Sequence, residues 1–427
     1  MNGGFRRRLR SIAVDLTPLR FRDFRLLWIS EILSETGSNI TLVAVYLQVY
    51  RLTGSAAAVG LIGLVQLAPL MAGSLFGGPY IDRYDRRRLL LVAQIAQACG
   101  SVLLLVGALM DPTPVVVVYI GAAIIAGLSG FALATRSAMT PTLVPMERLP
   151  SALALNQVMW QTAQIVGPAL GGVIIGQFGL AWAYGVDVVS FGATITAVWL
   201  MRPHPPLVTP EGDDTEQSGW RRLTDGFRFL KGRRVLQSTF GIDLIAMIFG
   251  MPRSLFPILA VTQFNAGAET VGLLFSAVSI GALVGALTSG WVHRVSRQGV
   301  AIIAAVILWG CAIAAFGISG DRLFLACTFL AVAGGADVVS AVFRSTILQD
   351  TVPDDLRGRL SGIHIAVVAG GPRIGDAEAG FVAAAVSPTV SVVSGGLICV
   401  VGVAVLALLV PEFARYKRGD AALRSTS

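Results

Sequence analysis

Charged residues are scarce in this sequence. Only 14% of its 427 residues are Asp, Glu, Lys or Arg, whereas 54% are hydrophobic; soluble globular domains carry roughly 25% charged residues. Because charges are so few, runs of about 20 mostly apolar residues recur, and each is long enough to cross a hydrocarbon core of roughly 30 Å as a helix. The composition therefore argues against a soluble domain and predicts an all-α polytopic membrane protein.

Residues that build metal centres, disulfides and active sites are also few. The cysteines form no Cys-x-x-Cys pair and all lie inside apolar runs, so neither a structural disulfide nor a metal site is expected. The three histidines are scattered, and no H-E-x-x-H motif, nucleophile elbow or Walker loop occurs. We therefore expect no enzyme, no cofactor and no ATP-driven pump. The cysteines are Cys99, Cys311, Cys327 and Cys399, and the histidines are His204, His293 and His364.

The formal net charge of +8 raises the question of a nucleic-acid partner. The basic residues of the chain instead gather in short segments between the apolar runs. No aromatic residues are interleaved with them to form a platform of the kind that binds single-stranded nucleic acid. Nucleic acid is thus not expected as a partner, whereas membrane lipids are. The Arg-rich N-terminus precedes an apolar run that is too long for a signal peptide and has no cleavage signature.

Apolar runs bounded by charge, Pro or Gly predict twelve membrane-spanning helices. They fall at residues 25–49, 56–81, 88–110, 114–136, 151–176 and 180–201, then at 236–261, 269–292, 298–318, 322–344, 359–384 and 388–410. Loops rich in Arg alternate with loops that are nearly free of basic residues. By the positive-inside rule, both termini and the Arg-rich loops are expected on the cytoplasmic side of a bacterial inner membrane.

A long linker separates six spans from six. Its first part is Pro-rich and acidic, which suits a flexible segment. In its second part Trp220, Leu223, Phe227 and Leu230 share one helical face, so an amphipathic helix at the membrane surface is expected, with an anchoring or a regulatory role. The expected divisions are an N-terminal segment 1–24, a six-helix bundle 25–201, the linker 202–235, a second bundle 236–410 and a tail 411–427.

The two halves repeat each other. Val59-Gly60-Leu61 matches Val271-Gly272-Leu273, and Gly73 and Gly78 match Gly285 and Gly290, all at an offset of 212; Arg136 matches Arg344 at 208. Two parallel six-helix repeats joined by a cytoplasmic linker resemble the major facilitator superfamily. That resemblance implies two pseudo-symmetric six-helix bundles, a small-molecule substrate bound between them near the midplane, alternating access, and function as a monomer.

The stretch "GGPYIDRYDRRR" between the second and third spans resembles the loop motif of that superfamily. Gly78 lets a neighbouring helix approach closely, and Asp82 sits at a helix C-terminus, where the macrodipole disfavours an anion. The resemblance implies a latch between the halves, in which Asp82 meets an Arg of the same loop together with the N-terminus of the eleventh span near Arg359. The alternative is a plain positive-inside loop, which explains the Arg residues but not the Asp. The motif residues are Gly78, Asp82, Arg83, Arg86 and Arg87.

In the fifth span, "GPALGG" places Gly167, Pro168, Gly171 and Gly172 on a small-residue face with a Pro bend. It resembles the fifth-helix motif of exporters in the superfamily. The alternative is helix packing alone, and the direction of transport depends largely on this motif.

Polar residues of the first span form one face, because Glu31, Ser34, Glu35, Ser38 and Asn39 recur at helical spacing. Glu35 lies roughly 15 Å from the cytoplasmic end, near the midplane. A carboxyl group there is costly and normally faces a cavity or a partner. It is a candidate for proton exchange or for pairing with a cationic substrate; the alternative is a structural salt bridge to another helix.

Further charges lie inside the predicted spans of the second half. Arg253, between two prolines, could attract an anionic ligand or lipid headgroups, and Asp243 is a further coupling or substrate candidate. Arg373 and Asp376 are three residues apart and are expected to neutralise each other. Asp337 and Arg344 are expected to form part of a cytoplasmic gate with Arg136 or Arg359.

The segments "GPRIGDAEAG", "GGADVVSAVFRSTILQDTVPDDLRGRLSG" and "GFRFL" resemble the enterobactin-exporter-like branch of the superfamily. The resemblance covers about residues 18–410. It implies an antiporter, driven by the proton gradient, that exports a siderophore or a drug-like molecule, as in multidrug resistance. The alternatives are an importer or symporter, or a transporter of a lipid-like substrate, on the same fold.

Overall fold

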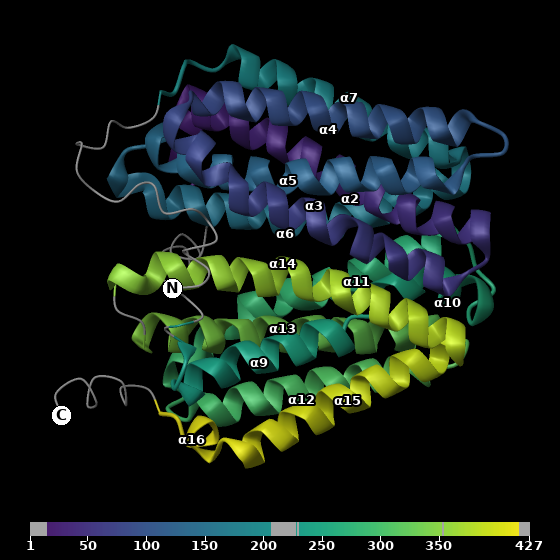
Figure 1. The fold of residues 1–427 in the computed structure, drawn as a ribbon, viewed down its shortest axis with the longest axis vertical. Coiled ribbons are helices and arrows are strands. Elements are labelled where there is room, and N and C mark those ends of the chain that lie inside the picture. Colours follow the sequence, from purple (N-terminus) through teal and green to yellow (C-terminus); the bar gives the residue numbers. More distant parts are fainter. Residues whose placement is uncertain (1–14, 206–227, 229, 352–353, 418–427) are drawn as a thin grey trace, which may run out of the picture.

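The computed structural model describes residues 15–205, 228, 230–351 and 354–417, with side chains left undescribed at residues 75, 76, 293 and 354–366. The described chain is helical throughout and forms two bundles, one above the other in Figure 1. The first bundle contains α2 (Arg22–Thr53), α3 (Ala56–Arg83), α4 (Arg86–Leu109), α5 (Val115–Leu143), α6 (Leu149–Phe178) and α7 (Leu180–Leu200). The second contains α9 (Arg234–Phe249), α10 (Phe256–Thr262), α11 (Ala268–Thr288), α12 (Gln298–Gly317), α13 (Leu323–Thr351), α14 (Asp354–Ala385) and α15 (Pro388–Leu409). Short helices η1 (Thr17–Arg20), η2 (Met146–Arg148), η3 (Arg253–Leu255), η4 (Ser289–Arg294) and α16 (Pro411–Ala414) complete the described part.

Each predicted span corresponds to a long helical segment, and the all-α prediction is confirmed. The seventh span is broken, because α9 ends at Phe249 and the chain resumes through η3 into α10. A break inside a membrane frees backbone groups that need partners. The indole of Trp309 supplies one by donating to the carbonyl of Gly250 at 3.0 Å.

Ten helical segments of the described chain are apolar and long enough to cross a membrane. α2 and α14 are not among these ten, although each is 32 residues long. These two helices carry Glu31, Glu35, Arg373 and Asp376. Charge inside a span has to be compensated by neighbours, so α2 and α14 are where function is expected to concentrate.

The outer faces of both bundles are apolar. Val189, Leu287, Phe324 and Leu408 each expose more than 70% of their surface. Isolated exposed apolar residues are common, but here they recur on most of the long helices. This pattern fits a lipid-facing surface around a multi-pass membrane protein.

The internal repeat is visible in how the helices cross. A Cβ added at Gly73 of α3 would lie 1.9 Å from the carbonyl oxygen of Gly127 in α5, and one added at Gly285 of α11 would lie 2.8 Å from that of Gly335 in α13. Only glycine permits such close backbone approaches. The same tight crossing therefore occurs once in each half.

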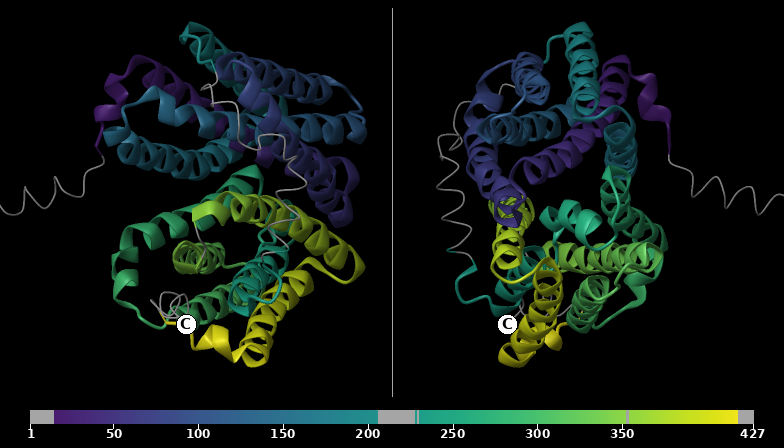
Figure 2. Two further views of the ribbon diagram at one scale, coloured as in Figure 1. Left: turned by 60° about the vertical axis from the view of Figure 1, so that its left-hand side comes forward. Right: turned by 90° about the vertical axis from the view of Figure 1, so that its right-hand side faces the viewer.

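The two bundles contact each other mainly through α3 with α14 and α6 with α11, as both views in Figure 2 show. A Cβ at Gly63 would lie 2.2 Å from the backbone oxygen of Arg373, and one at Gly172 would lie 2.7 Å from that of Ala268. These contacts lie toward the end at which α3 begins, which we call the opposite end. The other end, where the loops bearing Arg83, Arg148 and Arg294 lie, is called the basic end.

Two predictions about the connecting segments lie outside the described residues. Of the predicted amphipathic helix, Trp220, Leu223 and Phe227 are not described, whereas Leu230 is helical and buried. The side chain of Arg359, the predicted partner of the loop motif, is not described either.

Candidate functional site

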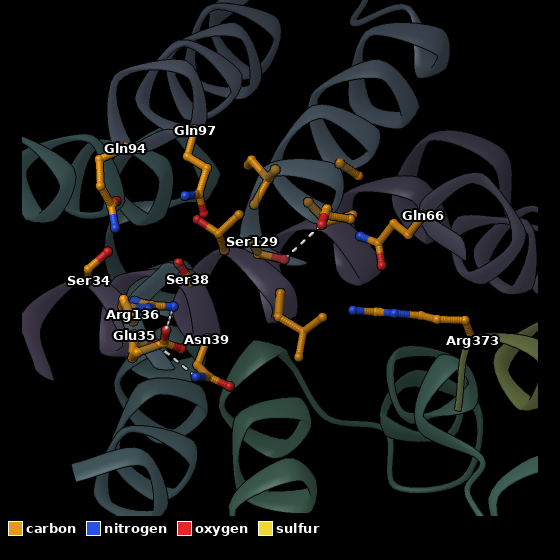
Figure 3. A pocket seen from close by; sticks show the side chains of 16 residues that line it. Ser34, Glu35, Ser38, Asn39, Gln66, Gln94, Gln97, Ser129, Arg136 and Arg373 are labelled. Atoms are coloured by element: carbon orange, nitrogen blue, oxygen red, sulfur yellow. Dashed lines mark hydrogen bonds and ion pairs between the residues drawn. The ribbon is translucent and has the colours of Figure 1, made fainter. Parts of the chain in front are cut away.

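A cavity of about 200 Å³ lies where the first bundle faces α14. Helices α2, α3, α4 and α5 supply most of its walls, and Arg373 of α14 is the lining residue from the second bundle (Figure 3). Its polar lining residues are Ser34, Glu35, Ser38, Asn39, Thr41, Gln66, Gln94, Gln97, Ser129, Arg136 and Arg373. The polar face predicted on the first span therefore lines a cavity.

Glu35 is paired with Arg136, which reaches it from α5. The guanidinium Nη2 of Arg136 donates to Oε1 of Glu35 at 3.0 Å, and its Nε lies 3.2 Å from Oε1 of Glu31. Glu31 and Glu35 are four residues apart on α2, so one turn of helix presents both acids to a single cation. The salt bridge that we considered as the alternative for Glu35 is present, and it forms part of the cavity wall.

The three side chains of this acid–Arg–acid triad become less exposed with distance from the cavity. The side chain of Glu35 is 22% exposed, that of Arg136 is 13% exposed and that of Glu31 only 7%. A proton arriving through the cavity would thus meet Glu35 first. Asn39 also lines the cavity and donates from Nδ2 to the backbone oxygen of Glu35 at 2.8 Å.

Three glutamines inside apolar helices face the same cavity. Gln94 and Gln97, three residues apart on α4, and Gln66 of α3 are all at least 93% buried. The side-chain oxygens of Gln66 and Gln94 accept no hydrogen bond from the described residues. Buried amides normally find partners, so these two oxygens are unusual in being both buried and unpaired among the described residues.

Arg373 and Asp376, which we expected to neutralise each other, do not form a direct ion pair, although both side chains are described. Asp376 instead accepts hydrogen bonds from the hydroxyl of Tyr46 at 2.5 Å and from the backbone N–H of Ser254 at 3.1 Å. The carboxylate of Asp376 is therefore bound by residues that are distant in the sequence, and not by Arg373. Arg373 extends toward the cavity (Figure 3).

A second acid–Arg–acid triad lies in the second bundle. Nη1 of Arg344 on α13 lies 2.7 Å from Oδ1 of Asp243 on α9, and its Nη2 lies 3.7 Å from Asp337. The offset from Glu35 to Asp243 is 208 (243 minus 35), the same as from Arg136 to Arg344 (344 minus 136). An acid–Arg ion pair therefore occurs in each half at a separation of 208 residues, although the second spans of the two halves are offset by 212.

The second pair differs in its access to the cavity. The side chains of Arg344 and Asp243 are only 5% and 3% exposed, and neither lines the cavity. Asp337 and Arg344 make no contact with Arg136 in this conformation, where each Arg is bound by acids of its own half. The alternative partner in the predicted gate, Arg359, has a side chain outside the described residues. Arg253 is half-buried in η3 and is absent from the cavity lining.

The loop motif is fixed to its own bundle. Asp85 caps α4 by accepting from the N–H of Arg87 at 2.8 Å, and Arg87 donates from Nε to the carbonyl of Val198 at 3.0 Å and from Nη2 to that of Trp199. Arg86 is buried and donates to the carbonyl of Ala138 at 3.1 Å. These bonds hold the loop against the ends of α5 and α7.

Gly78 and Asp82 make no comparable contact here. A Cβ at Gly78 would meet no heavy atom within 4 Å, so the predicted close helix approach is not made by the described part of the chain. Asp82 is exposed, as is Arg83. The halves contact at the opposite end in this conformation, whereas a latch at these residues would require contact at the basic end.

The small-residue motif of the fifth span packs on two sides. A Cβ at Gly167 would lie 2.5 Å from Cβ of Asn39, and one at Gly171 would lie 3.2 Å from Cα of Ile40, so both glycines face α2. Gly172 faces α11 of the other bundle, and the backbone oxygen of Pro168 meets Gly272 there. The motif thus joins a cavity-lining helix to the contact between the halves.

Sequence reasoning missed the glutamines, Ser129 and the role of Arg373. A signal for the glutamines was present, since amides inside otherwise apolar spans are unusual. The Asp243–Arg344 pair was not readable from the repeat, because the 212 offset of the neighbouring second span places Glu35 opposite Met247. In the described residues there is no group of three or more His, Cys, Asp or Glu side chains that could hold a metal ion.

Comparisons with known proteins agree on the fold. Over residues 13–422 the chain matches the protein family described as transmembrane secretion effector. It is 29% identical over 399 residues to the enterobactin exporter EntS of Citrobacter koseri and 28% identical to that of Escherichia coli, covering 92% of this chain and 93% of each relative.

Solved transporters share the architecture at much lower identity. A POT family transporter bound to 5-aminolevulinic acid superposes with a TM-score of 0.73 at 11% identity, covering 92% of this chain and 96% of that one. A mutant of the nucleoside transporter NupG superposes with a TM-score of 0.71 at 15% identity, covering 92% and 99%. The chain belongs to the transmembrane secretion effector family of the major facilitator superfamily, and it is a secondary transporter rather than an enzyme.

Proposed function

We propose that this protein is a proton-coupled exporter, an antiporter that moves a siderophore or a drug-like small molecule out of the cell. The observation that carries the proposal is the Glu35–Arg136 pair in the wall of a polar cavity between the two bundles. The relatives described as enterobactin exporters support outward transport, as does the small-residue motif at Gly167 to Gly172.

The geometry of the first triad supports proton coupling. Ionised Glu35 shares Arg136 with Glu31, so a proton taken up by Glu35 breaks one of the two ion pairs while Arg136 keeps the other. Neutralising Glu35 therefore leaves no uncompensated guanidinium, which a lone buried pair could not avoid. Uptake of the proton from one side and its release to the other, as the cavity changes sides, would drive substrate in the reverse direction.

The Asp243–Arg344 pair is a weaker candidate for coupling. It has the same arrangement of acid and cation, but it does not line the cavity. A carboxylate that meets neither water nor substrate has no route for a proton. We therefore assign coupling to Glu35 and a holding role, between α9 and α13, to Asp243.

The latch at the basic end belongs to the other conformation in this proposal. When the bundles close there, Gly78 would come against a helix of the second half, and Asp82 would reach the N-terminal turn of α14 near Arg359. Arg86 and Arg87 fix the loop to α5 and α7, and so they would transmit that contact to the first bundle as a rigid body.

We further propose that the protein acts as a monomer in a bacterial inner membrane with both termini in the cytoplasm. The alternation of basic and nearly uncharged loops supports this orientation. The Arg-rich basic end would then face the cytoplasm.

The direction and the substrate class can be tested in inverted membrane vesicles. An exporter takes substrate up into such vesicles when their interior is acid, and a panel of siderophores, macrolides and cationic dyes would identify the class. Uptake that the same gradient inhibits, or accumulation only in right-side-out vesicles, would favour an importer or symporter. The importer is the second candidate because the fold alone serves both directions.

A further inference from the structure

Charged side chains of both signs lie in the walls of the cavity. Among the described residues that line it, Glu35 is the one carboxylate, whereas Arg136 and Arg373 supply two guanidinium groups. Arg136 is engaged by Glu31 and Glu35. Arg373 forms no ion pair with any acid in the part of the chain that the structure describes, and its side chain projects from α14 toward the centre of the cavity (Figure 3).

The nearest acid in sequence is committed elsewhere. The carboxylate of Asp376 accepts from Tyr46 at 2.5 Å through one oxygen and from the N–H of Ser254 at 3.1 Å through the other. Ser254 also donates to the backbone oxygen of Asp376 at 2.9 Å, which fixes the helix turn. The negative charge of Asp376 therefore lowers the electrostatic potential at Arg373, but Asp376 does not form an ion pair with the guanidinium group of Arg373.

Hydrogen-bonding groups of the first bundle face the same space. Gln66 and Gln94 are 7% and 1% exposed, line the cavity and have side-chain oxygens without a donor among the described residues. Figure 3 shows Gln66 on the same side of the cavity as Arg373. The polar side chains of this wall favour a polar occupant over an apolar one.

We propose that Arg373 is the anchor for a planar oxyanion, such as a carboxylate, on the transported molecule. The guanidinium presents parallel donors that match a carboxylate, which a lysine ammonium does not. The remainder of the ligand lies against the glutamines, whose amides discriminate by hydrogen bonding. This inference rests on the proposed function to the extent that the cavity is the transport site.

Two consequences follow from the position of Arg373. It is the cavity residue contributed by the second bundle, so an anchored ligand links the bundles directly. At this anchor Arg373 attracts an anionic ligand and repels a cationic ligand of the same shape. The relevant discrimination is therefore between ligands of equal shape and different charge.

Benzoate, benzamide and benzamidinium provide such a set, with charges of −1, 0 and +1 on one planar skeleton. Ligand-observed NMR titrations of the full-length protein in detergent would measure their affinities. The expected order for the wild type is benzoate first and benzamidinium last. Arg373→Gln should weaken benzoate binding by roughly 10-fold or more, abolish the preference over benzamide, and leave benzamide binding nearly unchanged.

Two further variants serve as controls for the effect of Arg373→Gln. Arg373→Lys keeps the charge without the paired donors, so its affinity for benzoate should fall between those of the wild type and Arg373→Gln. Arg148→Gln makes the same substitution at a surface ion pair with Asp15, and it should behave as the wild type. If Arg373→Gln failed to fold, Arg373→Lys and the wild-type order would still decide the matter.

The inference would be overturned by wild-type protein that fails to bind benzoate or binds benzamidinium more tightly. It would equally be overturned if Arg373→Gln kept the preference for benzoate. These are equilibrium measurements without a proton gradient, so their failure leaves the coupling role of Glu35 standing. Conversely, loss of that coupling role would leave the charge preference intact.

Discussion

Tyr46→Phe tests how the two bundles are held together at the opposite end. The Tyr46 hydroxyl of α2 donates to Asp376 of α14 at 2.5 Å, and Tyr46 is only 1% exposed. The phenylalanine ring can keep the contact with Phe275, whose ring centre lies 6.1 Å away. The substitution therefore removes one hydrogen bond between the halves and little else.

The size of the effect follows from the charge on the acceptor. A hydrogen bond to an ionised group contributes about 1.5–3 kcal/mol. Once the bundles separate at this end, water can solvate Asp376 in the variant and in the wild type alike, so most of the loss falls on the closed state. At about 1.4 kcal/mol per factor of ten, the equilibrium should move roughly 10- to 150-fold toward opening of the opposite end.

Spin labels at positions 52 and 386, introduced through Leu52→Cys and Val386→Cys in an otherwise cysteine-free protein, would report this opening. The distance between them would be measured by pulsed electron–electron double resonance. Both residues are exposed, and they belong to different bundles at the opposite end. Longer distances are expected in Tyr46→Phe. The matched control is Tyr184→Phe, which removes a 2.6 Å hydrogen bond to Gln48 inside the first bundle. Unchanged distances in Tyr46→Phe, or equal shifts in both variants, would refute the reasoning.

Two further predictions concern packing and pH. Gly63→Ala places a Cβ 2.2 Å from the backbone oxygen of Arg373, so it should weaken the contact of α3 with α14 by about 1–3 kcal/mol. The distances between the same spin labels should therefore lengthen. Gly185→Ala is the control, because its Cβ would meet no heavy atom within 4 Å, and it should leave these distances unchanged. At the basic end, the hydroxyl and N–H of Thr17 hold the pKa of Asp15 below its ordinary value of 3.8. A lowered folded pKa means that this contact stabilises the fold above the ordinary pKa and is lost as pH falls through the lowered one. Thr17→Ala should raise the pKa of Asp15 in an NMR titration; an unchanged pKa would contradict this account.

The spans could be predicted from the sequence because length and apolarity alone determine which segments can cross a membrane. The break between α9 and α10 contains Pro252 and is followed by Pro257, and both prolines were visible in the sequence. The depth of Glu35 in the membrane could also be predicted, because the rise per residue of a helix converts its position in the span into a distance from the span's end. The partner of Glu35 was not accessible, because the crossing of α5 over α2 is a property of tertiary packing.

Arg373 and Asp376 show where local spacing misleads. Residues three apart on a helix can pair, but such a pair contributes only about 0.2–0.5 kcal/mol. Tyr46 and Ser254, which reach Asp376 from other elements, offer shorter and better directed hydrogen bonds. The sequence contains the residues of this arrangement but not their proximity, and the cavity role of Arg373 depends on that proximity.

The central claim is that Glu35 carries the coupling proton. Proteoliposomes containing the wild type, Glu35→Gln or Asp243→Asn can be assayed for substrate accumulation driven by a pH gradient and for counterflow without one. The account predicts that Glu35→Gln loses gradient-driven accumulation but keeps counterflow, while Asp243→Asn keeps both. Accumulation at the wild-type rate in Glu35→Gln, or its loss in Asp243→Asn alone, would contradict the claim.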